Sequence, residues 1–188
     1  MLEPSGLPMT QCVALIRGIN VGHAKRVAMS DLRAVVEELG CQDVRTLLNS
    51  GNVVFKKTRP RMTVLAQQIE AGLLRACGVS ARAIVFEAMV LNDIIRENPL
   101  RSVANDPARH MVAFVARPSV LAEARPLLRQ SWAPEAFAVG TRAAYLWCAN
   151  GVLDSKLAKA FGRITGDAVT ARNWATVLKL QSVGENAD

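Results

Sequence analysis

The chain of 188 residues is long enough for one domain or two small ones, and its 23 basic and 16 acidic side chains give a formal net charge of +7. Hydrophobic residues make up 51% and charged residues 21%, as in a globular protein with a buried core. No apolar run reaches the roughly 20 residues of a membrane-spanning helix, and the four separated cysteines lack a C-x-x-C pair. We expect a cytoplasmic protein with no cofactor, no metal, no membrane contact and anionic partners.

The first half of the chain has a pattern of alternating strands and helices. The run CVALI before Arg17 is continuously apolar, as in a buried strand. Leucine and valine recur at i, i+3, i+4 and i+7 from Leu32, which predicts an amphipathic helix. The predicted order is strand, helix, strand, strand, helix, strand, over residues 12–17, 29–40, 43–48, 52–56, 61–78 and 81–86. This order is typical of a ferredoxin-like (split βαβ) unit, here residues 1–87.

The second half, residues 88–188, partly repeats this order after a bridging helix that Asn98-Pro99 ends. The expected elements are a strand at 110–116, a helix at 119–130, two strands within 136–148, a short helix at 154–162 and a helix at 170–183. Because the last element is predicted as a helix rather than a strand, the second copy is interpreted as degenerate. The predicted fold class is α+β, with two ferredoxin-like halves packed as one compact unit.

A candidate site follows from this topology at one end of the first sheet. The first two strands of a split βαβ unit run parallel, and the third lies antiparallel between them. The loop RGINVG after the first strand and the hairpin NSGN before the third are therefore expected at the same end. Arg17, Asn20, Asn49, Ser50 and Asn52 would converge there. Alternatively, the asparagines only stabilise tight turns, since asparagine and glycine both tolerate positive φ.

Two cations in the second half add to the candidate site. Lys156 follows the predicted N-cap Asp154 by two residues, and Arg172 follows the predicted N-cap Thr170 by two. The helix dipole disfavours a cation in the first turn and favours an anion there. A bound phosphate or carboxylate would explain both positions. Alternatively, each long side chain bends back into water.

Six segments together resemble a widespread bacterial family that is known only as a domain of unknown function. They are ALIRGINVG, MSDLRAVVEELG, DVRTLLNSGNVVF, ENPL, DSKL and TARNWATVLKL, between about Val13 and Leu180. The resemblance implies an α+β fold of two ferredoxin-like halves, with signature residues at Arg17, Gly18, Asn20, Gly22, Ser50, Gly51, Asn52, Ser155, Lys156, Arg172, Asn173 and Trp174. His23 stands where the family commonly has glycine and Asn49 where it has glutamine, so the resemblance assigns neither a role.

Three functions are consistent with these patterns. The first is binding of a phosphorylated or carboxylated small molecule, with or without catalysis, by Arg17, Asn20, Ser50, Asn52, Lys156, Arg172 and Asn173. Acylphosphatases place an arginine-bearing phosphate loop similarly, and His23 is a candidate general base. The second is binding of nucleic-acid phosphates, although the third strand offers only Phe55 for base stacking. The third is a structural or interaction protein, in which hydrogen bonds within the loops occupy these polar side chains.

Overall fold

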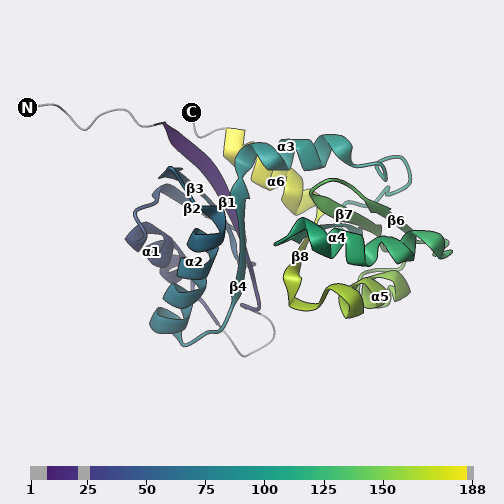
Figure 1. Ribbon diagram of the computed structural model, residues 1–188, viewed down its shortest axis with the longest axis horizontal. Coiled ribbons are helices and arrows are strands. Elements are labelled where there is room, and N and C mark those ends of the chain that lie inside the picture. Colours follow the sequence, from purple (N-terminus) through teal and green to yellow (C-terminus); the bar gives the residue numbers. More distant parts are fainter. Residues whose placement is uncertain (1–7, 21–25, 186–188) are drawn as a thin grey trace, which may run out of the picture. The chain divides into compact units, whose positions relative to one another are not determined.

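The computed structural model describes residues 8–20 and 26–185. The chain divides into two compact units, unit one (Met1–Ala88 and Val183–Asp188) and unit two (Met89–Ser182). Each unit contains a four-stranded antiparallel sheet, and the described residues form six α-helices (Figure 1). The fold is therefore α+β, as predicted. The expectation that the two halves pack as one compact unit stays a prediction.

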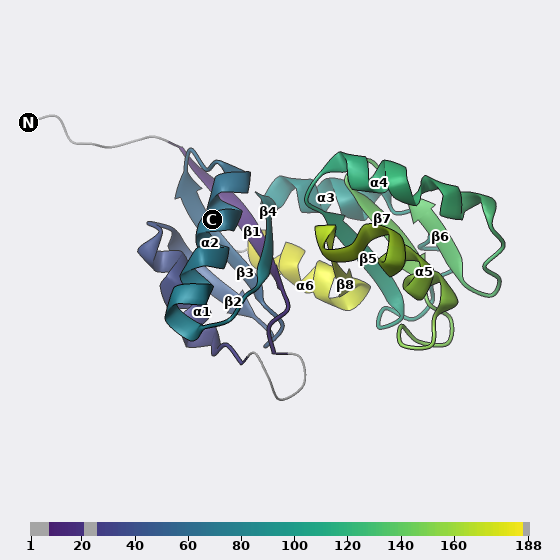
Figure 2. The same cartoon turned by 60° about the horizontal axis from the view of Figure 1, so that its bottom comes forward.

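Unit one has the predicted order of strands and helices. Its elements are β1 (Met9–Arg17), α1 (Met29–Glu38), β2 (Gln42–Leu47), β3 (Asn52–Thr58), α2 (Met62–Cys77) and β4 (Arg82–Glu87). The strand order is β2-β3-β1-β4, so β1 lies inside the sheet and pairs antiparallel with both β3 and β4 (Figure 2). Because β3 is also antiparallel to β2, β1 and β2 run parallel.

The centre of β1 is continuously apolar because both of its faces are buried. Cys12 and Ile16 share a core cluster with Leu32 of α1 and Ile69 of α2, so the two helices cover one face of the sheet. Val13, on the opposite face, is also fully buried. Burial of both faces removes the polar alternation that a half-exposed strand would show.

Unit two repeats this architecture. Its elements are α3 (Ala88–Glu97), β5 (His110–Val115), α4 (Pro118–Ala124), the short 3-10 helix η1 (Arg125–Arg129), β6 (Ala136–Val139), β7 (Ala143–Trp147), α5 (Lys156–Thr165), the 3-10 turn η2 (Gly166–Ala168), β8 (Val169–Asn173) and α6 (Trp174–Glu185). The strand order is β6-β7-β5-β8, in which β5 takes the place that β1 has in unit one.

The prediction of a helix over residues 170–183 is wrong for its first four residues. Residues 169–173 form β8, which pairs with β5 through Thr170 and Phe114, and the helix α6 begins only at Trp174. The second copy is therefore not degenerate, because β5 to β8 follow the same strand order as β1 to β4, with helices at the corresponding places in the chain. The strand was missed because pairing with β5, a contact distant in sequence, determines its conformation.

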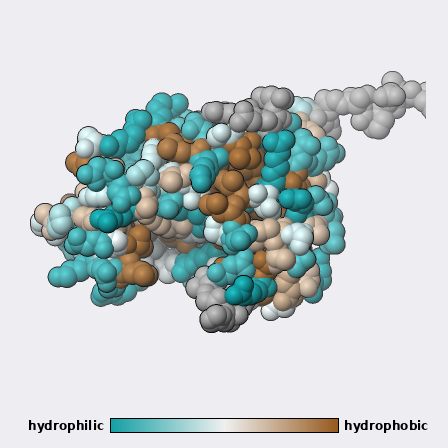
Figure 3. Space-filling view, turned by 180° about the vertical axis from the view of Figure 1, so that it is seen from behind, coloured by the Kyte–Doolittle hydropathy of each residue, from teal (hydrophilic) through white to brown (hydrophobic). Residues whose placement is uncertain are grey.

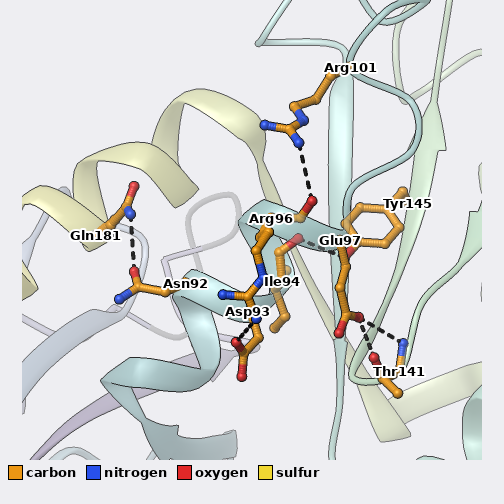
Figure 4. Close-up of polar contacts among 9 residues, drawn as sticks. All are labelled: Asn92, Asp93, Ile94, Arg96, Glu97, Arg101, Thr141, Tyr145 and Gln181. Carbon is orange, nitrogen blue, oxygen red and sulfur yellow. Dashed lines mark hydrogen bonds and ion pairs between the residues drawn. The ribbon is translucent and has the colours of Figure 1, made fainter.

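Helices cover both faces of the sheet in unit two. Leu146 belongs to a core cluster with residues of α4 and α5. The adjacent Tyr145 is on the other face, where its hydroxyl donates a hydrogen bond to the carbonyl oxygen of Ile94 in α3 at 2.7 Å (Figure 4). Glu97, at the end of α3, accepts hydrogen bonds from the amide and the hydroxyl of Thr141 in the β6–β7 turn. These contacts attach α3 to the sheet.

Candidate functional site

The loop that follows β1 and the turn that joins β2 to β3 lie at the same end of the sheet, as predicted. Leu15 of β1 and Leu47 of β2 both pair with Asn52, the first residue of β3. The amide of Ile16 donates to the carbonyl oxygen of Gly51 at 2.7 Å, which joins the end of β1 directly to the turn. The two polar segments are therefore adjacent in space.

Asn20 connects three segments at this end of the sheet. Its amide nitrogen donates to the carbonyl oxygens of Val27 and Asn49, both at 3.0 Å. Its side-chain oxygen accepts from the Val27 amide at 2.9 Å. Asn20 has a φ of 55°, a left-handed conformation that asparagine adopts more easily than most residues. These contacts make Asn20 a residue that positions the loop and the turn.

Asn52 has a comparable role inside the β2–β3 turn. It is 0% exposed, and its amide nitrogen donates to the Leu47 carbonyl oxygen and to the Ser50 hydroxyl oxygen, both at 2.9 Å. A buried amide needs such partners, since an unsatisfied polar group in the interior is costly. Of the two side chains, Ser50 is the exposed one.

Arg17 ends β1 beside a second arginine. Along a strand, alternate residues share a face, so Arg17 lies on the same face as Leu15 and its partner Asn52. Arg17 is half-buried and directly opposite Arg82 in the β1–β4 ladder. Arg82 forms an ion pair with Glu70 of α2 at 3.3 Å. No sequence pattern marked Arg82, because its position depends on the register of two strands distant in sequence.

In unit two, α5 has Ser155 as its N-cap, not the predicted Asp154. The Ser155 hydroxyl oxygen accepts a hydrogen bond from the Ala158 amide at 2.8 Å, and Ser155 is buried. Aspartate and serine are both good N-cap residues, so two adjacent candidates could not be separated by type. Lys156 is consequently the first helical residue, and its side chain is exposed.

The N-terminus of α5 has an anionic partner within unit two. Oε2 of Glu135 accepts a hydrogen bond from the Leu157 amide at 3.1 Å. A carboxylate at this position satisfies a free amide and interacts favourably with the helix dipole. The protein's own side chain therefore provides the anion that was expected from a ligand beside Lys156.

Arg172 lies in β8, so the argument from the helix dipole does not apply to it. Its Nη1 donates to the Thr170 hydroxyl at 2.9 Å and to the Ala171 carbonyl oxygen at 2.8 Å. Burial lowers the pKa of Arg172 to about 10, so the guanidinium stays charged at neutral pH. Asn173 is the residue before α6, and its side-chain oxygen accepts from the Thr176 amide at 2.9 Å, as an N-cap does.

A buried polar cluster around His110 was not predicted from the sequence. The side-chain oxygen of Asn98 accepts from the Leu100 amide at 3.0 Å, so the Asn98 amide nitrogen donates to Nε2 of His110 at 3.2 Å. The His110 ring stacks on Trp174 with centroids 5.1 Å apart. His110 is 1% exposed, and burial lowers its pKa below the usual 6.5. The geometry requires a neutral ring, because Nε2 is an acceptor.

Acidification is expected to destabilise the protein through His110. The unfolded chain protonates this histidine near pH 6.5, whereas the folded protein does so only at lower pH. The stabilising contribution is therefore present above pH 6.5 and is lost as the pH falls below it. Urea denaturation at pH 7.5 and 5.5 measures the effect. A His110→Phe variant should be less stable than the wild type at pH 7.5 but should lose less stability on acidification. A wild-type pH dependence in His110→Phe would contradict this assignment.

Other predicted features lie in the core or outside the described residues. Phe55 is 1% exposed and belongs to the core of unit one, so it is not available for base stacking. Gly22 and His23 lie outside the described residues. Within residues 8–20 and 26–185, no three histidine, cysteine, aspartate or glutamate side chains form a group that could hold a metal ion. None of the helices formed by these residues has both the length and the apolar composition to cross a membrane.

Comparisons with known proteins identify a family and a related fold. The family described as "Protein of unknown function (DUF1697)" matches residues 9–145. The conserved bacterial protein SP0830 from Streptococcus pneumoniae, whose structure is solved, has 20% sequence identity to this chain. The match covers 95% of this chain and 100% of the SP0830 chain, with a TM-score of 0.77. A putative chlorite dismutase, TA0507, is 10% identical over 93% of this chain and 98% of its own, but its TM-score of 0.24 is too low to support an argument. No curated protein matches the chain.

Proposed function

Since the chain belongs to the DUF1697 family of proteins of unknown function, we propose its function from its own residues: unit one binds a small phosphorylated or carboxylated molecule at Arg17. The proposal includes a ferredoxin-like arrangement of both units, which places the end of β1 beside the β2–β3 turn. Arg17 supplies the charge that binds the anion, and Ser50 is the second residue proposed to contact it. Asn20 and Asn52 act as positioning residues.

The observation that carries this proposal is the pair of arginines at the end of the sheet. Arg17 and Arg82 are direct cross-strand partners. Arg82 is also ion-paired with Glu70, so Arg17, Arg82 and Glu70 together carry a net charge of +1, which makes this end of the sheet attractive to an anion. A bound phosphate or carboxylate would accept charge-assisted hydrogen bonds from a guanidinium.

The proposed site is smaller than the set of residues singled out in the sequence. Lys156, Arg172 and Asn173 belong to unit two. Hydrogen bonds within that unit account for Arg172 and Asn173, and the Glu135 carboxylate already occupies the helix end beside Lys156. The proposal therefore assigns anion binding to unit one alone.

Replacement of Arg17 tests the proposal. We expect the wild-type protein to bind inorganic phosphate or acetate, and Arg17→Gln to weaken that binding about tenfold or more, because hydrogen bonds to charged groups contribute on the order of 1.5–3 kcal/mol. Isothermal titration calorimetry at constant ionic strength measures both affinities, since exposed charges are screened by salt.

The matched control is Arg75→Gln, which removes the same charge from an exposed position in the last turn of α2. This variant should bind both anions as tightly as the wild type does. Equal losses in the two variants would show that only the net charge matters. Unchanged affinity in Arg17→Gln, or no binding by the wild type, would overturn the proposed function.

A further inference from the structure

Leu48, in the turn between β2 and β3, combines a strained backbone with an exposed apolar side chain. Its φ is 58°, in the left-handed region that glycine and asparagine adopt readily and leucine does not. Leu48 is also 47% exposed to solvent. Neither feature stabilises the folded chain, so the presence of leucine at this position needs another explanation.

Hydrogen bonds hold the backbone on both sides of Leu48. The Asn52 amide nitrogen donates to the carbonyl oxygen of Leu47 at 2.9 Å. The Asn20 amide nitrogen donates to the carbonyl oxygen of Asn49 at 3.0 Å. Strained conformations persist where the surrounding contacts determine them, and they are concentrated at ligand-binding sites. The two positioning residues of the proposed anion site thus also fix the conformation of Leu48.

Exposure alone does not distinguish Leu48 from other residues. Hydrophobic residues reach the surface at several places (Figure 3), and Leu74 of α2 is 55% exposed on a helical backbone. Backbone conformation does distinguish it. The described non-glycine residues with positive φ are Asn20, Asp43, Leu48 and Arg59. Leu48 is the apolar residue of this set, and it lies beside the proposed site.

We propose that Leu48 is a specificity residue, and that the anion bound at Arg17 carries an apolar group that packs on it. This inference rests on the proposed function of unit one. β3 lies between β2 and β1, so the end of β2, before Leu48, is about 10 Å from the end of β1 at the usual strand spacing. The ligand class is therefore an organic phosphate or carboxylate with an aryl or alkyl group several ångströms from its charge.

A comparison of inorganic phosphate with phenyl phosphate tests this inference. By calorimetry, the wild-type protein should bind phenyl phosphate about tenfold more tightly, because the ligand covers the exposed part of a leucine. Leu48→Asn should remove most of this preference. It should also raise the melting temperature by about 2–4 °C, since asparagine adopts the left-handed conformation with less strain.

The control is Leu74→Gln, which removes a leucine of similar exposure from a helix and should keep the preference for phenyl phosphate. Equal wild-type affinity for the two probes, with binding still lost in Arg17→Gln, would overturn the inference and leave the anion site intact. A preference that survives Leu48→Asn would also overturn it. Absence of binding to either probe would overturn both the inference and the proposed function.

Discussion

Gly51→Ala is expected to destabilise unit one by about 3 kcal/mol or more, the sum of a left-handed alanine and an overpacked core. Gly51 has a φ of 73°. A Cβ atom at this position would lie 2.8 Å from Cβ of Ile16, 2.9 Å from Cδ1 of Ile19 and 3.0 Å from the Ile16 carbonyl oxygen. The backbone of β1 fixes Cβ and the carbonyl oxygen of Ile16, so these atoms cannot move away from a new Cβ atom without distorting the sheet.

Urea denaturation of Gly51→Ala and Gly78→Ala separates the cost of backbone strain from the cost of overpacking. Gly78, after α2, has a φ of 66°, but a Cβ atom there would have no heavy atom within 4 Å beyond its immediate chain neighbours and its own helix. Its replacement should therefore cost only the backbone strain, about 1–2 kcal/mol. Equal losses in the two variants would mean that the end of β1 does not pack closely on the turn.

Asn52→Ala is expected to cost about 2–3 kcal/mol, because it removes the side-chain donor to the half-buried Leu47 carbonyl group and opens a small cavity at a fully buried position. Asn52 is 0% exposed, and its amide nitrogen is bonded to the Leu47 carbonyl oxygen and the Ser50 hydroxyl. If unit one binds an anion as proposed, the same variant should also weaken that binding, since Asn52 positions the turn. Chemical denaturation gives the first effect and calorimetry with phosphate the second.

Ser50→Ala is the matched control for this variant. It removes one of the two acceptors of the Asn52 amide at an exposed position, and the bond to Leu47 remains. Its effect on stability should be below about 1 kcal/mol. If Ser50→Ala and Asn52→Ala were equally unstable, the hydroxyl rather than the Leu47 carbonyl would be the important partner.

The adjacency of the loop after β1 and the β2–β3 turn could be predicted, because it depends on element order. Once β1, β2 and β3 are identified, a split βαβ connection puts the loop after Arg17 beside the Ser50 turn, and pairing of Leu15 and Leu47 with Asn52 confirms that the two segments are adjacent. The roles of individual side chains were harder to predict from the sequence. Asparagine at a turn fits both a ligand contact and a structural hydrogen bond, and only the bond geometry distinguishes the two.

The missed features depend on contacts between segments distant in sequence. The strand around Arg172 forms because it pairs with β5, about sixty residues earlier in the chain. Local sequence instead favoured extension of the helix that starts at Trp174. In the same way, the proximity of Arg82 to Arg17 and of Glu135 to Leu157 comes from the packed structure. A pattern within one segment does not contain that information.

The position of β1 within its sheet has a consequence for synthesis of the chain. β1 leaves the ribosome before its two neighbours, which are completed only at Thr58 and Glu87. At about 5–20 residues per second, this strand has both hydrogen-bonding edges unpaired for several seconds. Its Cys12–Ile16 core is also the most continuously apolar stretch of unit one. We therefore expect nascent chains to be most prone to aggregation before β4 emerges, and arrest of translation within α2 to prolong that period.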